Sequence, residues 1–128
     1  MQSVTNLAGR ILMVAIFLWG GLGKISGYAG FEQYMRHLGL AVWLTPFVIL
    51  LELGGGLAVL LGFYTRVMAL ALACFCVATA GLVHYHPQDP MQMINFMKNL
   101  SMTGGFLILA AYGAGKLSLD ERLKLRLR

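Results

Sequence analysis

Residues 42–63 read VWLTPFVILLELGGGLAVLLGF, and this stretch decides the fold. It is long enough to cross the hydrocarbon core of a bilayer as a helix, which takes about 20 residues. Pro46 stands near its start, and a helix tolerates proline in its first turn. Glu52 is the one charged residue in the stretch. We therefore expect a membrane-spanning helix that carries one ionisable side chain near its middle.

The composition of the whole chain points the same way. Hydrophobic residues make up 59% of the 128 residues and charged residues 12%, which is about half the usual charged share of soluble domains. A soluble domain could not cover its surface with so few charges, so we expect one integral membrane domain, residues 1–128, in contact with a lipid bilayer. The net charge of +5 gathers at the ends of apolar runs. This placement favours membrane topology and no nucleic-acid partner.

Further apolar runs precede and follow residues 42–63. We predict an all-α fold, a bundle of four transmembrane helices at about 7–25, 42–63, 66–85 and 94–113. The first run is short, so its basic ends, Arg10 and Lys24, should snorkel to the membrane surfaces. A β-barrel would show alternating segments of about ten residues, and the sequence has none.

A short amphipathic helix is predicted between the first two spans. Phe31, Tyr34, Met35 and Leu38 recur there at helical spacing. We expect residues 30–38 to lie at the membrane interface, with this apolar face toward the hydrocarbon.

The orientation follows from the lysines and arginines. With four spans, the two termini and the link at 62–66 share one side of the membrane. That side holds seven of the ten basic residues: Arg10, Arg66, Lys116, Arg122, Lys124, Arg126 and Arg128. Positive residues concentrate on the cytoplasmic side, so we expect a multi-pass protein of a bacterial inner membrane with both termini in the cytoplasm.

The basic cytoplasmic tail, residues 116–128, carries a helix signal of its own. Ser118 and Glu121 have the spacing of a capping box, which predicts a short helix. Such a helix could be held against anionic lipid. A tail that only aids solubility and fixes topology explains the same residues equally well.

Ionisable side chains inside spans are costly and mark a functional site or a structural pair. Glu52 shares a helix face with Gly55 and Gly56, so it should point into the bundle. We expect an outward-facing polar pocket with Glu52 at its floor, paired with Lys98 or Lys24 because an unpaired buried charge is unstable. The catalytic candidates are Glu52, Lys98 and His84. The ligand-pocket candidates are Lys24, Glu52, His84, Asn95, Lys98 and Asn99.

Two other interpretations bear on these residues. The charged and amide side chains could serve only to fix the packing of the four helices, an interpretation of equal weight. His84 and His86 are weak metal candidates, since their spacing matches no defined site, and we expect no metal. Cys74 and Cys76 lie in an apolar run, which favours inert thiols.

Several short blocks, in order along the chain, resemble the DoxX family of small four-helix membrane proteins. Arg10 leads into the first span, and the blocks are GGLGKISGY (20–28), LELGGG (51–56), LGFYTR (61–66), NFMKNL (95–100) and GGFL (104–107). The family takes its name from a subunit associated with thiosulfate:quinone oxidoreductase, and other members look like membrane partners of redox or thiol-stress systems. The polar positions of its pattern are matched here by Lys24, Glu52, Arg66, Asn95, Lys98 and Asn99.

Two functions of different class remain open, the first suggested by the resemblance and the second by buried charges that only fix helix packing. In the first, the chain is a membrane subunit or partner of a quinone-linked oxidoreductase: Lys98 and His84 would hold a quinone carbonyl, and Glu52 would handle protons. Electrons would then come from a partner, because the chain has no flavin, haem or iron–sulfur motif. In the second, it is a non-catalytic scaffold or assembly protein, acting with a protein partner or as a homo-oligomer. Whether the chain is an enzyme stays open between them.

Overall fold

The structure is a computed structural model, and it describes residues 1–124 of the chain. Every regular element in that range is a helix, which confirms the predicted all-α class. The last four residues of the predicted basic tail, 125–128, lie outside the described range.

The helices form four long rods and two short pieces. The first rod is α1 (Gln2–Ser26), and the last is α6 (Pro90–Tyr112). The second rod is built from four consecutive segments, η1 (Val42–Leu44), α3 (Thr45–Leu50), the π-helical turn η2 (Leu51–Gly55) and α4 (Gly56–Leu61). The third joins α5 (Thr65–Thr79) to a second π-helical turn, η3 (Ala80–His84). The short pieces are α2 (Tyr28–His37) and α7 (Leu119–Arg122).

Three of the rods are long and apolar enough to cross a membrane: Gln2–Ser26, Val42–Leu61 and Thr65–His84. The fourth rod, α6, has a comparable length of 23 residues. It is more polar because Asn95, Lys98 and Asn99 fall in its first half. The predicted fourth span therefore remains a prediction.

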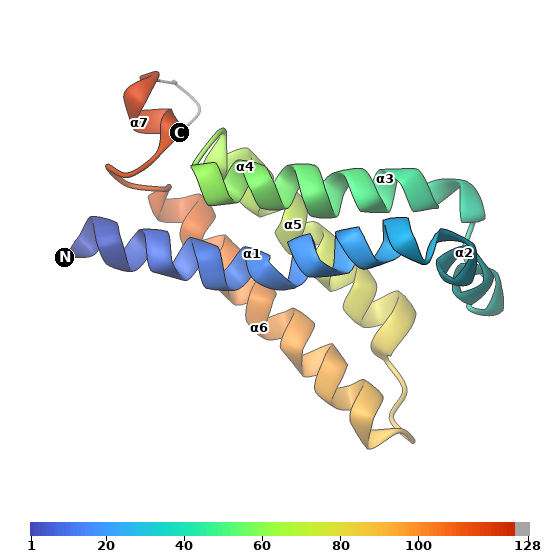
Figure 1. The fold of residues 1–128 in the computed structure, drawn as a ribbon. Coiled ribbons are helices and arrows are strands. Elements are labelled where there is room, and N and C mark those ends of the chain that lie inside the picture. Colours follow the sequence, from blue (N-terminus) through green and yellow to red (C-terminus); the bar gives the residue numbers. More distant parts are fainter. Residues whose placement is uncertain (125–128) are drawn as a thin grey trace.

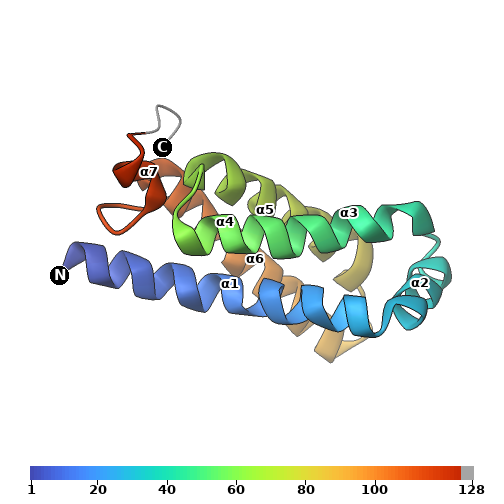
Figure 2. The same ribbon diagram turned by 45° about the horizontal axis from the view of Figure 1, so that its top comes forward.

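The rods pack as two antiparallel pairs that cross each other. Figures 1 and 2 show α1 beside α3 and α4, with α5 and α6 forming the second pair across them. The core lies where the pairs cross and includes Val14, Phe17, Val59, Leu72 and Phe106. The rings of Phe17 and Phe106 meet edge to face with centroids 5.5 Å apart. The N-terminus and α7 lie at one end of the molecule, and α2 lies at the other (Figure 1).

Two glycines of this core allow close contact between helices. A Cβ atom at Gly21 would lie 2.7 Å from Cγ of Leu53, and one at Gly105 would lie 2.9 Å from Cε of Met13. Real side chains do not approach so closely. At Gly21 a Cβ would press on the Leu53 side chain of η2, so the absence of a side chain favours the close approach of α1 to η2. At Gly105 it would meet the flexible end of Met13, which can move aside.

Arg10 corrects one sequence expectation. The side chain does not snorkel to the membrane surface but is buried, with 1% of its surface exposed. Its Nη1 donates hydrogen bonds to the carbonyls of Val59 (3.1 Å) and Leu60 (2.8 Å), and its Nε donates to Oδ1 of Asn6 (3.1 Å). Nη2 donates to the carbonyl of Leu117. The guanidinium thus joins α1, the end of α4 and the C-terminal segment.

A second buried charge, Asp120, completes this junction. Its carboxylate accepts hydrogen bonds from the amides of Tyr64 (2.7 Å) and Thr65 (2.9 Å) and from the Thr65 hydroxyl (2.6 Å), so it caps the start of α5. The Ser118 hydroxyl accepts from the amide of Glu121 (3.2 Å), which confirms the predicted short helix at this place. We call the Arg10 and Asp120 contacts the terminal clasp.

Candidate functional site

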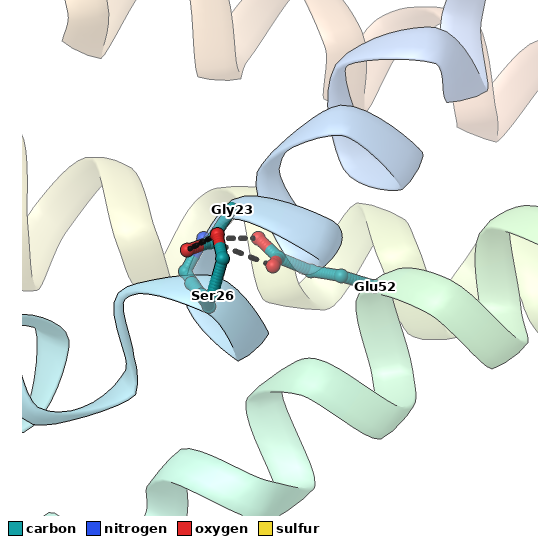
Figure 3. A network of polar contacts seen from close by, with 4 residues as sticks. Gly23, Ser26 and Glu52 are labelled. Carbon is teal, nitrogen blue, oxygen red and sulfur yellow. Dashed lines mark hydrogen bonds and ion pairs between the residues drawn. The ribbon is translucent and has the colours of Figure 1, made fainter.

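Glu52 pairs with Lys24. The Lys24 Nζ lies 2.9 Å from Oε2 of Glu52 and donates a hydrogen bond of 3.1 Å to Oε1. Figure 3 shows the Glu52 carboxylate reaching from its own helix to the last turn of α1, where Gly23 and Ser26 lie. Glu52 is 6% exposed, so this is a buried ion pair. Of the two partners considered from the sequence, Lys24 is the one in contact.

The local backbone makes room for this pair. Gly20 faces it, and a Cβ there would lie 3.5 Å from Lys24 Nζ and 3.9 Å from both carboxylate oxygens of Glu52. Gly21, one residue later, permits the close approach of α1 to η2. Glu52 itself belongs to the π-helical turn η2. Such turns shift the direction of side chains relative to an α-helix and are frequent at functional sites.

The ion pair borders a cavity of about 490 Å³. Its lining includes the ionisable residues Lys24, Glu52, His84 and Tyr34, and most of the others are apolar. One wall is the apolar face of α2 that the sequence predicted: Phe31, Tyr34, Met35 and Leu38. That face lines a cavity that is partly open to the outside, since the lining residues Tyr34, Phe47 and Leu82 are themselves exposed. The remaining walls come from η1, α3, α5 and their neighbours, with Leu40, Leu44, Phe47, Val48, Leu51, Phe75, Ala78, Thr79, Leu82 and Val83.

Lys24 also contacts this wall directly. Its Nζ lies 5.1 Å from the centroid of the Phe31 ring, within the range of a cation–π interaction. The ammonium group is therefore held from two sides, by a carboxylate of η2 and by an aromatic ring of α2. The Lys24 side chain as a whole keeps 20% of its surface exposed.

His84 lies in the same cavity lining and is oriented by a residue that sequence reasoning missed. Its Nδ1 is 2.7 Å from Oε1 of Gln92 on α6. With this oxygen as the acceptor, Nδ1 is the donor of the contact. No sequence signal links the two residues, because they lie on different helices on either side of the 85–89 turn.

Lys98, Asn95 and Asn99 lie elsewhere. Lys98 is exposed and lines a separate groove between α1 and α6. The Asn99 amide donates to the carbonyl of Asn95 (3.0 Å), and Thr103 donates to the carbonyl of Asn99 (2.8 Å), so these bonds stay within α6. The structure thus divides the residues predicted for one pocket into two groups. The reason is the course of α6, whose first half diverges from α1 beyond their crossing (Figure 1).

The structure also shows where the remaining metal-ligand and thiol candidates lie. His86 lines a cleft with His37 and Asp89. Asp89 is engaged as the cap of α6 and accepts from the amides of Met91 (2.9 Å) and Gln92 (3.3 Å). Within residues 1–124, no three His, Cys, Asp or Glu side chains are grouped as a metal site would require. Cys74 and Cys76 are free thiols, the first exposed and the second in the core.

Comparison with known proteins identifies relatives along nearly the whole chain. Residues 5–85 match the sequence model of the DoxX family. Inner membrane protein YqjF of Escherichia coli is 48% identical over 123 residues, covering 96% of this chain and 95% of the relative. Inner membrane protein YphA of the same organism is 37% identical over 128 residues, with coverage of 94% and 91%. The uncharacterized protein YdgD of Bacillus subtilis is 30% identical over 78 residues, with coverage of 60% and 68%. No solved structure matches.

Proposed function

Because this chain belongs to the DoxX family and resembles inner membrane proteins along nearly its whole length, we propose that it is a membrane subunit or partner of a quinone-linked redox system. Its ligand is a quinone bound in the cavity beside Lys24 and Glu52. The observation that carries this proposal is a buried ion pair that opens into an otherwise largely apolar cavity.

The cavity suits the two chemical parts of a quinone. Its volume of about 490 Å³ lies within the range of about 300–1,000 Å³ that small-molecule sites occupy. A quinone ring and tail are apolar and fit walls such as Phe31, Phe47 and Phe75. Its carbonyl oxygens are acceptors, and the Lys24 ammonium in the cavity lining is a donor.

The same residues serve the proton chemistry. Reduction of a quinone to a quinol takes two electrons and two protons, one proton at each carbonyl oxygen. Lys24 donates a hydrogen bond to the carbonyl oxygen that gains negative charge, and Glu52 relays one of the two protons to that oxygen. The second proton reaches the other carbonyl oxygen from water. His84 lines the same cavity. The two electrons come from a partner protein, which is the sense in which the chain is a subunit.

The proposal includes a membrane arrangement. Helix α6 is the fourth span, since 23 residues extend about 34 Å and the hydrocarbon core is about 30 Å thick. Both termini lie in the cytoplasm, where most basic residues then fall. The Lys24 end of α1 faces outward, so the cavity lies in the outer half of the bundle.

A second candidate is a non-catalytic scaffold or assembly protein. The same ion pair favours it, because Lys24 fastens α1 to η2 across the bundle and Phe31 adds α2 to the contact. A buried pair of this kind specifies which helices are neighbours without any ligand.

Extraction of the purified protein and mass spectrometry of the extract separate the two. We expect quinone in the wild type and a loss of roughly tenfold or more in Glu52→Gln and Lys24→Met, since each removes a charged contact. Arg36→Gln is the matched control, because Arg36 makes only an exposed contact of 3.9 Å with Glu32. Lys98→Met should also keep its quinone. A wild type without quinone, together with a sharply lower melting temperature in Glu52→Gln, would favour the scaffold.

A further inference from the structure

A groove separates α1 from the first half of α6. The two helices touch at Met13 and Gly105 and at Phe17 and Phe106, and from there α6 runs away from α1 toward Pro90 (Figure 1). The space between them measures about 660 Å³. It is separate from the Glu52 cavity, with which it shares no lining residue. The divergence of two packed helices therefore creates a second recess on the lipid-facing side.

The lining of this groove is apolar except at one place. Ile16 of α1 faces Met93, Met97 and Met102 of α6, and thioether side chains are flexible enough to follow an irregular apolar chain. Lys98 is the charged lining residue, and Ser101 lies one turn further along the helix. Nearly all of the groove surface is apolar, so Lys98 lines it mainly with its aliphatic chain, and the ammonium group of this exposed residue stands at its edge.

Lys98 has no counter-charge in residues 1–124. No carboxylate of that range lies within ion-pair distance of its Nζ, and no hydrogen bond engages it. Along α6 it stands about 12 Å from Pro90, at a rise of about 1.5 Å per residue. An ammonium group at that depth is costly without an anion, although the long side chain can reach back toward the surface.

We propose that this groove binds an anionic phospholipid, with the phosphate on Lys98 and one acyl chain along Ile16 and the methionines. A neutral lipid would cover the apolar surface and leave Lys98 unpaired. A small water-soluble anion would pair with Lys98 and leave the apolar surface uncovered. The lipid site is independent of the quinone proposal, because it shares no residue with the Glu52 cavity.

Native mass spectrometry of the detergent-purified full chain tests the site. Phosphatidylglycerol or phosphatidylcholine is added, and the lipid-bound fraction is measured as collision energy rises. We expect the wild type to hold one phosphatidylglycerol more firmly than phosphatidylcholine. Lys98→Met should weaken that binding roughly tenfold and Lys98→Arg should preserve it, while Arg36→Gln, which removes an exposed cation elsewhere, should leave it unchanged.

Three results would overturn the proposal. The first is equal retention of both lipids by the wild type. The second is full retention of phosphatidylglycerol by a Lys98→Met protein whose melting temperature matches the wild type. The third is displacement of the lipid when copies of the chain associate, which would assign the groove to a second copy. A further experiment adds inorganic phosphate at millimolar concentration. If phosphate alone displaces the lipid, the apolar surface contributes nothing to lipid binding, and the lipid assignment fails.

Discussion

Arg10 is a single residue on which three parts of the chain depend. Its guanidinium contacts Asn6 on α1, two carbonyls at the end of α4 and the carbonyl of Leu117. A planar group with five N–H donors can satisfy these acceptors together, and the point charge of lysine cannot. The sequence did not reveal this role, because an arginine at the start of an apolar run fits the pattern equally well whether its guanidinium contacts water or other parts of the protein.

Replacing Arg10 should destabilise the whole bundle. Arg10→Met leaves three carbonyl oxygens without their donor and Asp120 without a nearby cation, at a cost of about 3–5 kcal/mol for a broken buried charge contact. Thermal unfolding of the detergent-purified protein measures the change. Arg10→Lys should recover part of the loss. Arg36→Gln should melt like the wild type, and an Arg10→Met protein that did the same would contradict this role.

At the scale of the helix, the sequence predicted more about faces than about neighbours. The apolar face of α2 and the inward direction of Glu52 both follow from helical spacing, and both are found. Spacing on one helix does not tell which other helix lies opposite. From the sequence, Lys24 and Lys98 were therefore equally suitable ion-pair partners for Glu52. In the structure the partner is Lys24, because α1 approaches η2 closely at Gly21 and α6 diverges from α1.

The π-helical turns η2 and η3 lie beyond sequence prediction for a related reason. Each adds one residue to a turn within an otherwise regular rod, and no residue type marks the place. The glycines at 54–56 predicted close helix packing but not the wider turn. Both turns contribute an ionisable side chain, Glu52 and His84, to the cavity.

The approach of α1 to η2 can be tested with one added methyl group. Gly21→Ala places a Cβ 2.7 Å from Cγ of Leu53, so the helices must separate, at a cost of about 1–3 kcal/mol. The separation should also loosen Lys24 from Glu52 and lower the retained quinone. Gly23→Ala is the control on the same helix, because a Cβ there meets no atom within 4 Å. It should be neutral or stabilising by up to about 1 kcal/mol. Equal melting temperatures for the two variants would refute the close approach.

At the scale of the molecule, the bundle has one end that joins the N-terminus and the segment 117–120 and one that holds the cavity. The N-terminus and that segment lie together at the terminal clasp, and α2 with the Lys24–Glu52 pair lies at the far end (Figure 1). Apolar run lengths were sufficient to predict helices close to the observed rods. They did not predict that the C-terminal segment folds back on the bundle, because its bonds go to backbone carbonyls and amides, which every residue has.

Reporter fusions test the four-span arrangement. A fluorescent protein that folds only in the cytoplasm, fused after residue 128, should fluoresce, and alkaline phosphatase at the same place should be inactive. Fused after Gln88, in the turn before α6, the two reporters should behave the other way round. If both fusion sites report the same side, α6 does not cross the membrane and the orientation of the cavity must be revised.

The clasp also imposes an order on biogenesis. Arg10 is synthesised 107 residues before Leu117, its most distant hydrogen-bond partner. During that interval its charge lacks part of its final set of acceptors, so the first helix cannot settle fully into the bilayer beside α4. A nascent chain halted before residue 117 can already offer Arg10 the acceptors of Asn6, Val59 and Leu60, but Nη2 has no partner until the carbonyl of Leu117 arrives. The last bond of the guanidinium therefore forms only when the C-terminal segment folds back on the bundle.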